Sequence, residues 1–313
     1  MNHAQLRRAA IMVAAAAAGV AVLAACGDDA AGGGAGRRPA GSASPDASAA
    51  ALSSRPFTVT HIGGPTTIVT IAGSRILLDP TFDPPKTYKS GLVKTQGPAI
   101  GIDRIGKIDA VLLSHDQHDD NLDDSGRKLL KDIPVVLSTP GAHRRLGAHV
   151  TGLRSWDSYK LRTGSTTITV TAVPALHGPD GVDRGADGEV TGFVLSGAGV
   201  PTTYISGDNA SVKVAKKAGE RIKKDIGPID TAILFAGAAR TPAILNNAPL
   251  TLTSEKAAIV AKDLDPRKVV PVHTDSWNIY SQKMPTLVRA FADQGLSDRL
   301  AVPGAGGTAE NLR

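Results

Sequence analysis

Alternating apolar and polar positions open the part of the chain that carries large side chains. Residues 57–62 alternate, and residues 66–71 and 75–79 continue as short runs rich in β-branched and aliphatic side chains. Gly63-Gly64-Pro65 and Ala72-Gly73-Ser74 separate these runs. Short runs divided by turn residues are typical of strands joined by tight turns. The pattern predicts an antiparallel meander of three strands.

Further strands and helices follow in both halves of the chain. Strands are predicted over residues 110–113, 134–137, 166–173, 192–195, 202–205, 230–235 and 268–272. Helices are predicted over residues 122–131, 211–224, 252–264 and 282–294. Thr251 or Thr253 caps the third helix, and Gly295 ends the last one. This distribution predicts two sheets with helices outside them.

Two segments rich in Gly and Pro interrupt this pattern, at residues 80–107 and 178–189. A long stretch without hydrophobic periodicity usually carries a binding loop. We expect both segments to line a cleft.

The start of the chain has a different character. Arg7 and Arg8 precede a mostly apolar run over residues 11–25, which Leu23-Ala24-Ala25-Cys26 closes. Residues 1–26 thus resemble a bacterial lipoprotein signal with its lipobox, and either general or twin-arginine export is compatible with it. The resemblance implies an exported protein, lipidated at Cys26, whose folded part lies outside the cytoplasm and is anchored to the cell membrane.

Composition divides the rest of the chain into a tether and a domain. Residues 27–55 contain almost no large apolar side chain, which predicts a flexible, disordered tether, and residues 56–313 remain as one folded domain. The formal net charge is +6; without Arg7 and Arg8 it is +4, and the charges of the tether cancel. This mild charge comes with no basic cluster interleaved with aromatics, so nucleic acid is not an expected partner.

His and Asp residues stand at the ends of five predicted strands, where the chain turns into a loop. These are Asp79, the cluster of residues 115–120, His177, Asp208 and His273. Side chains at strand ends are held by a rigid sheet and project into a common cleft. Because Cys26 is the only cysteine, metal ligands in the folded domain must be imidazoles and carboxylates. Such ligands suit zinc, with manganese as the competitor.

The order Asp, His-rich cluster, His, Asp, His resembles the metallo-β-lactamase superfamily. Five strings narrow the resemblance to the branch typified by ascorbate-phosphate lactonase and, more distantly, by lipid phosphodiesterases. They are His61-Ile62-Gly63-Gly64-Pro65-Thr66, Leu78-Asp79-Pro80-Thr81-Phe82-Asp83-Pro84, Ser114-His115-Asp116-Gln117-His118-Asp119-Asp120-Asn121-Leu122-Asp123, Ser206-Gly207-Asp208 and Val270-Pro271-Val272-His273. The match extends from about residue 57 to residue 300.

The resemblance implies an α+β fold, the four-layer αββα sandwich of two mixed β-sheets flanked by helices. It also implies one or two divalent ions in a cleft at the sheet edge. A metal-activated water would hydrolyse an ester, lactone or phosphodiester bond in a small-molecule or lipid-like substrate.

The cluster departs from the family pattern His-x-His-x-Asp-His and allows two registers. In the strict register, counted from His115, Gln117 takes the place of the second histidine and Asp119 that of the aspartate. A register shifted by one places His118, Asp120 and Asn121 at the positions of His, Asp and His. We favour the shifted register because it keeps a second imidazole, although Asn121 is a poor metal ligand. Asp119 is then a carboxylate at the N-terminus of the following helix.

The expected roles follow from this register. The metal ligands are His115, His118, Asp120, His177, Asp208 and His273. Asp120 also acts in catalysis, and His61 either orients substrate or only holds the Gly63-Gly64 turn. Asp79 either supports the metal ligands or only caps a turn before Pro80.

Two other functions compete with a hydrolase. A metal- or ligand-binding lipoprotein of the same fold that has lost turnover would explain Gln117 and Asn121. A solute-binding lipoprotein would share the signal and the tether, but it would not need histidines at three strand ends.

Overall fold

The computed structural model describes residues 56–310 and 312, except residues 165, 183–184 and 243. The signal sequence, Cys26 and the tether lie outside the described residues. Within the described part, none of the helices combines the length and the apolar character that crossing a membrane requires.

The first sheet contains seven strands in the order β15-β1-β2-β3-β6-β7-β8. They are β1 (Thr58–Gly63), β2 (Thr66–Ile71), β3 (Ser74–Leu78), β6 (Ala110–Leu112), β7 (Val136–Ser138), β8 (Val150–Gly152) and β15 (Thr308–Ala309). The first three form the predicted antiparallel meander. Strands β3, β6, β7 and β8 are parallel, so their carboxyl ends lie at one edge of the sheet.

The second sheet contains six strands in the order β14-β13-β12-β11-β10-β9. They are β9 (Ser158–Thr163), β10 (Thr166–Pro174), β11 (Thr191–Gly197), β12 (Val200–Ile205), β13 (Thr231–Phe235) and β14 (Lys268–Val272). Strands β9 to β12 form an antiparallel meander, and β12, β13 and β14 are parallel. A separate small hairpin, β4 (Lys86–Thr87) and β5 (Val93–Lys94), lies within the predicted binding loop.

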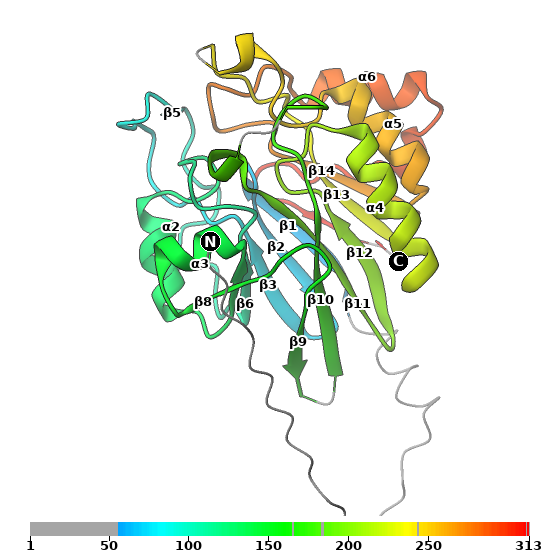
Figure 1. The fold of residues 1–313 in the computed structure, drawn as a ribbon, viewed down its shortest axis with the longest axis horizontal. Coiled ribbons are helices and arrows are strands. Elements are labelled where there is room, and N and C mark those ends of the chain that lie inside the picture. Colours follow the sequence, from blue (N-terminus) through cyan, green and yellow to red (C-terminus); the bar gives the residue numbers. More distant parts are fainter. Residues whose placement is uncertain (1–55, 165, 183–184, 243, 311, 313) are drawn as a thin grey trace, which may run out of the picture. The chain divides into compact units, whose positions relative to one another are not determined.

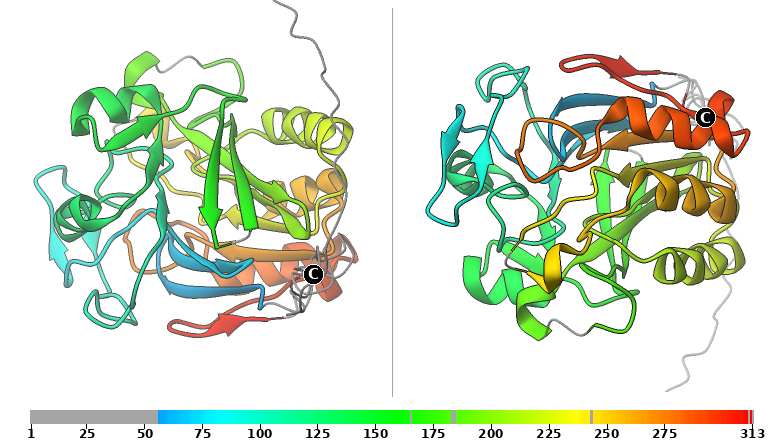
Figure 2. Two further views of the ribbon diagram at one scale, coloured as in Figure 1. Left: turned by 90° about the horizontal axis from the view of Figure 1, so that it is seen from below. Right: turned by 90° about the horizontal axis from the view of Figure 1, so that it is seen from above.

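Helices cover the outer face of each sheet (Figures 1 and 2). The helices α2 (Asp124–Leu129) and α3 (Pro140–Leu146) lie on one side, and α4 (Val212–Asp225), α5 (Ser254–Leu264) and α6 (Met284–Asp293) lie on the other. Short 3-10 turns occupy Leu130–Asp132, Gly185–Gly188, Leu245–Asn247 and Ser297–Arg299. Thr253 caps α5, because its hydroxyl accepts a hydrogen bond from the Lys256 amide.

Three hydrophobic clusters join these layers. One contains inward-facing residues of both sheets, such as Val69 and Val170. A second packs α4, α5 and α6 against the second sheet, and a third packs α2 and α3 against the first sheet through residues such as Leu130 and Leu146. The predicted fold class, an α+β sandwich of mixed sheets flanked by helices, is therefore confirmed.

Some local expectations were incomplete or wrong. Strands β8, β9 and β15 and the short helix α3 were not predicted, because they lie at sheet edges or in segments with few large apolar residues. The expectation that Asp119 lies at the N-terminus of the following helix was wrong. Helix α2 starts at Asp124, and the Asp123 carboxylate caps it by accepting from the Gly126 amide, so Asp119 lies in the preceding turn.

Candidate metal centre

Two groups of side chains with metal-ligating atoms meet where strands of both sheets end. The three-histidine cluster consists of His115, His118 and His177, and the carboxylate cluster consists of Asp120, Asp208 and His273. Within each cluster the ligating atoms lie within 4.8 Å of one another. All six residues were expected as ligands, and the fold brings all six together.

The imidazoles of the three-histidine cluster face one another through their ring nitrogens. His118 Nδ1 lies 2.7 Å from His115 Nε2 and 3.1 Å from His177 Nε2. His177 Nδ1 lies 2.8 Å from the Leu250 carbonyl oxygen, which can only accept a hydrogen bond. A neutral His177 therefore carries its proton on Nδ1 and turns the lone pair of Nε2 toward the cluster.

A similar contact orients His115. The Ser114 hydroxyl donates to Asp79 Oδ2 at 2.6 Å and lies 2.9 Å from His115 Nδ1. Since the hydroxyl proton is used on Asp79, the hydroxyl oxygen accepts from His115 Nδ1. The lone pair of His115 Nε2 thus also points inward, so the cluster has the arrangement that binds a cation.

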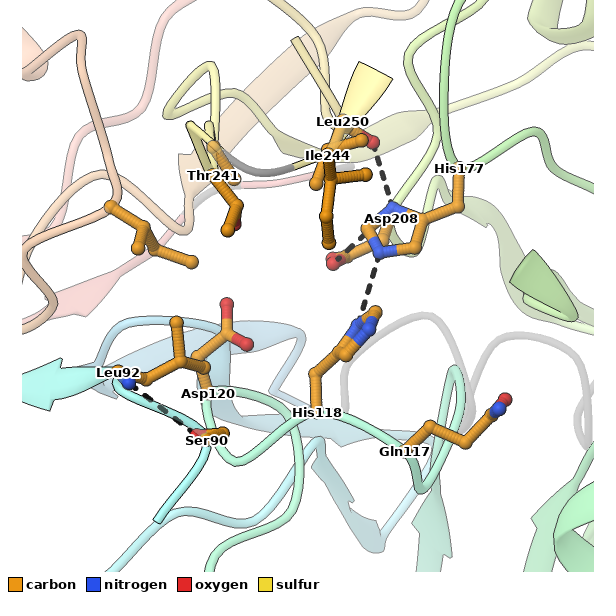
Figure 3. Close-up of a pocket in the computed structure, with 12 residues that line it drawn as sticks. Ser90, Leu92, Gln117, His118, Asp120, His177, Asp208, Thr241, Ile244 and Leu250 are labelled. Carbon is orange, nitrogen blue, oxygen red and sulfur yellow. Dashed lines mark hydrogen bonds and ion pairs between the residues drawn. The ribbon is translucent and has the colours of Figure 1, made fainter. Parts of the chain in front are cut away.

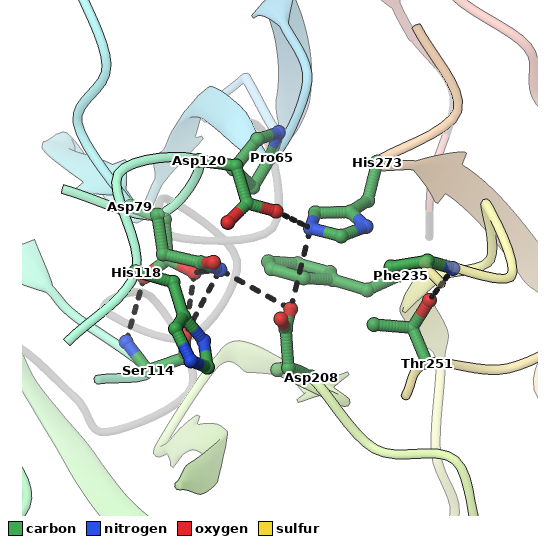
Figure 4. Close-up of polar contacts among 12 residues, drawn as sticks. Pro65, Asp79, Ser114, His118, Asp120, Asp208, Phe235, Thr251 and His273 are labelled. Atoms are coloured by element: carbon green, nitrogen blue, oxygen red, sulfur yellow. Dashed lines mark hydrogen bonds and ion pairs between the residues drawn. The ribbon is translucent and has the colours of Figure 1, made fainter. Parts of the chain in front are cut away.

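The three residues of the carboxylate cluster are each at most 2% exposed, and Figure 4 shows the contacts among them. His273 Nε2 lies 3.3 Å from Asp120 Oδ2 and 3.4 Å from Asp208 Oδ1. Neither ring nitrogen of His273 makes a hydrogen bond of normal geometry within the described part of the chain. Buried polar nitrogens without such a bond are rare, and coordination of a cation would satisfy Nε2. The donor set therefore fits a divalent ion.

Electrostatics in this cluster reflect two carboxylates buried side by side. Burial, together with the charge of Asp120, raises the pKa of Asp208 to about 7, despite the opposing effect of His273. Burial also opposes ionisation of Asp120, but the close contact with His273 and its charge outweigh burial and lower the pKa of Asp120. One buried histidine does not neutralise both carboxylates, which leaves room for a cation's charge.

Asn121, expected at the last position of the shifted register, donates hydrogen bonds to two carboxylates. Its side-chain amide donates to Asp79 Oδ2 at 2.9 Å and to Asp208 Oδ1 at 3.1 Å. Asp79, expected as a supporting residue, also accepts the Ser114 amide and hydroxyl. Burial raises its pKa to about 6, although Ser114 and Asn121 act in the opposite direction. Asp79 and Asn121 thus hold His115, through Ser114, and Asp208 in place.

The two registers of the cluster differ clearly in the structure. His118 belongs to the three-histidine cluster, whereas the Asp119 carboxylate accepts a hydrogen bond from the Ser90 hydroxyl in the β4–β5 hairpin. Asp116, which follows His115, is buried in an ion pair with Arg145. The structure thus places His118, and not Asp119, beside the other two imidazoles.

His61, for which the sequence left open a substrate-orienting role and a turn-holding role, lies in a different set of contacts. Its Nε2 is 2.8 Å from Asp275 Oδ2, and the other Asp275 oxygen accepts the Gly64 amide at 2.7 Å. The Gly64 carbonyl in turn accepts the His273 amide at 2.8 Å. This chain of contacts fastens the loop of His273, whose φ of 65° is strained for a residue with a Cβ. The geometry thus gives His61 the expected turn-holding position.

Two supporting contacts were not foreseen. The Tyr280 hydroxyl donates to Asp120 Oδ2 at 3.1 Å, and the Tyr280 ring lies 4.0 Å from the ring of His273. The Leu250 carbonyl orients His177. No local pattern marks either residue, because each acts through a partner far away in the sequence.

A cavity of about 530 Å³ opens over both clusters (Figure 3). His118, Asp120, His177 and Asp208 line it. The two Gly- and Pro-rich segments were expected here: Ser90 and Leu92 of the first line the cavity, and no described residue of 178–189 does.

Comparison with known proteins agrees with this geometry. Residues 74–274 match the beta-lactamase superfamily domain. The chain belongs to this family. The expectation of a metallo-hydrolase of the superfamily is confirmed at the level of the family, while the ascorbate-phosphate lactonase branch remains a prediction.

The individual relatives and solved structures have low sequence identity to this chain. A UPF0173 metal-dependent hydrolase of Anaeromyxobacter sp. (strain K) is 28% identical over 228 residues, covering 69% of this chain and 73% of the relative. The isothiocyanate hydrolase from Delia radicum gut bacteria has a similar structure, with a TM-score of 0.67, 20% identity and coverage of 80% of this chain and 98% of that one. A possible metal-dependent hydrolase from Veillonella parvula gives a TM-score of 0.64 at 20% identity, covering 81% and 99%. These structures support the fold.

Proposed function

We propose that the protein is a metal-dependent hydrolase that holds one divalent ion in each cluster. The observation that carries the proposal is that two groups of three ligating side chains lie at one cavity, and that two members of each group, His118 and His177 and Asp120 and Asp208, line it. The ligands are imidazoles and carboxylates, which suit zinc and also accommodate manganese. Bound divalent ions polarise the substrate and lower the pKa of water, so that a nucleophile forms at neutral pH.

Side chains of the protein position the reacting groups. Asp120 lines the cavity, where its carboxylate can accept a proton from the attacking water. The water oxygen bonds to the electrophilic carbon or phosphorus of an ester, lactone or phosphodiester. The bond to the leaving oxygen breaks, and the proton passes to that oxygen. Tyr280 and His273, which are not part of the described cavity lining, both contact Oδ2 of Asp120.

Two measurements on the purified protein test this function: metal analysis and hydrolysis assays with a panel of substrates. We expect up to two ions per chain and metal-dependent hydrolysis of a chromogenic ester, lactone or phosphodiester. A protein loaded with metal that turns over none of the three classes would contradict the proposal. That outcome would favour a binding lipoprotein that has lost turnover, as the Asn121 substitution suggests.

We further propose that the protein is exported and anchored to the cell membrane through a lipid on Cys26. The support is the signal-like sequence of residues 1–26 and the polar segment that follows. Cys26→Ser should yield an unprocessed or soluble protein, as measured by membrane fractionation and by the mass of the N-terminal region. A variant that is processed and membrane-bound like the parent would refute the anchor.

A further inference from the structure

Two chemically different sets of side chains line the cavity (Figure 3). One set consists of the ligating side chains His118, His177, Asp120 and Asp208. The other set, which we call the apolar wall, consists of Leu92, Ala239, Ile244, Leu250 and Ile279. Ser90, Gln117 and Thr241 complete the described lining, which contains no lysine or arginine. Bound substrate would therefore contact aliphatic side chains as well as ligating groups.

A hydrophobic cluster of its own backs the apolar wall. Leu92, Ala239 and Leu250 are buried together with three aromatic residues, Tyr88, Trp277 and Tyr280. Ile244 and Ile279 pack against this group and stay partly exposed. These residues come from three loops, and none belongs to the clusters that join the sheets and helices. The apolar wall thus packs separately from the hydrophobic clusters that join the sheets and helices.

The wall is linked directly to the three-histidine cluster. Leu250 lines the cavity with its side chain, while its carbonyl oxygen lies 2.8 Å from His177 Nδ1. One residue therefore belongs to the apolar wall and also contacts the three-histidine cluster. A group bound on the wall would place an attached acyl carbon at a set position relative to the clusters.

Resting on the proposed hydrolase function, we propose that the substrate is an uncharged carboxylic ester or lactone with a compact apolar group that binds the wall. Burying such a group is favourable in proportion to its apolar area. A phosphate group located away from the scissile bond would instead lie among aliphatic side chains and carboxylates, with no cation in the described lining to pair with it. The cavity therefore favours apolar acyl substrates over phosphorylated ones.

Binding can be measured without turnover by titrating the purified protein with propan-1-ol, butan-1-ol and hexan-1-ol in a calorimeter. We expect affinity to increase about fourfold per methylene until the wall is covered. Ile244→Asp and Ile279→Asp should abolish this dependence. Ile226→Asp, at an exposed isoleucine after α4, is the matched control and should keep it. Equal affinities along the series, or the same loss in the control, would overturn the inference.

Measurement of hydrolysis rates is the second part of the test. With the p-nitrophenyl esters of acetate, butyrate and hexanoate, kcat/KM should rise with chain length and exceed the value for bis(p-nitrophenyl) phosphate. Faster metal-dependent hydrolysis of the phosphodiester would overturn the substrate class and leave the hydrolase proposal standing. If no substrate is hydrolysed by metal-loaded protein, the proposed function fails, and the alcohol titration still decides whether the wall binds apolar groups.

Discussion

The three-histidine cluster and the carboxylate cluster lie at one cavity, but the protein holds them in different ways. The Leu250 carbonyl and the Ser114 hydroxyl orient two of the three imidazoles. The carboxylate cluster buries two acidic groups with one histidine, and burial raises the pKa of Asp208 to about 7. Hydrogen bonds thus organise the first cluster, whereas the second contains buried charge that a cation would stabilise.

This difference indicates how each cluster should respond to change. Loss of an imidazole removes a ligand from a site that is otherwise already arranged. Loss of metal destabilises the carboxylate cluster, because ionising two neighbouring buried carboxyl groups is energetically unfavourable. Loss of an imidazole and loss of metal should therefore have different effects on metal affinity and stability.

Removal of a histidine ligand should have the largest effect. Nδ1 of His118 lies close to a nitrogen of each of the other two imidazoles. His118→Ala therefore removes one of the three expected ligands of this cluster. Loss of an outer partner alone typically costs about 10- to 100-fold in metal affinity, so we expect a loss above about 100-fold here. Bound metal per chain after dialysis is the measurement.

Asp119→Ala is the matched control, because Asp119 lies next to His118 but bonds Ser90. It should retain full metal occupancy. If Asp119→Ala loses metal while His118→Ala keeps it, the shifted register is wrong.

Metal removal should have the next largest effect, on stability. A ligand that binds only the folded state stabilises it by about 2.7 kcal/mol at a hundredfold excess over Kd. For a domain of this size that corresponds to a fall in Tm of roughly 5 to 11 °C on chelation. Calorimetry with and without chelator measures the shift.

A double variant links this effect to the carboxylate cluster. Asp120→Asn combined with Asp208→Asn removes both buried negative charges, so chelation should lower its Tm by less than in the parent. A parent whose Tm is unchanged after complete metal removal would argue against a metal centre integrated with the fold.

Asn121→Ala should act more weakly and on one cluster. The variant deprives Asp208 and Asp79 of an amide donor but removes no expected ligand. We expect about 10- to 100-fold weaker binding of one ion per chain, with the other ion retained. Metal titration resolves the two steps, and equal weakening of both ions would show that the clusters are not separable in this way.

The smallest effect concerns a carboxylate outside both clusters. Burial opposes ionisation of Asp83, but hydrogen bonds from Lys86, Ser125 and Tyr88 outweigh burial and lower its pKa from 3.8 to about 2. A lowered folded-state pKa contributes stability above the unfolded-state pKa and loses it as pH falls. Asp83 should therefore contribute up to about 2 kcal/mol above pH 4 and progressively less toward pH 2.

Urea unfolding of the parent and of Asp83→Asn at several pH values checks this expectation. The difference in unfolding free energy should shrink as pH falls from 4 toward 2. A difference that stays constant with pH would mean that Asp83 stabilises the protein without its charge.

Much of the candidate site could be predicted because its signals are local. An apolar run followed at once by His or Asp, as in residues 110–115 and 269–273, specifies both a buried strand and a polar group at its end. The sandwich fold places such ends together. Four of the five strand ends therefore supply all six expected ligands, and the fifth supplies Asp79. The lipid anchor at Cys26 rests on the same kind of local pattern and stays a prediction.

The supporting contacts could not be predicted, because they join positions far apart in the sequence. His61 and Asp275 are 214 residues apart, and Asp120 and Tyr280 are 160 apart. His61 has the same sequence signal as a ligand, namely a position at a strand end, but the sheet places it against Asp275. The sequence alone determined which residue types end each strand. Only the tertiary structure decided which of them face each other, because that choice depends on how the two sheets pack and where their loops meet.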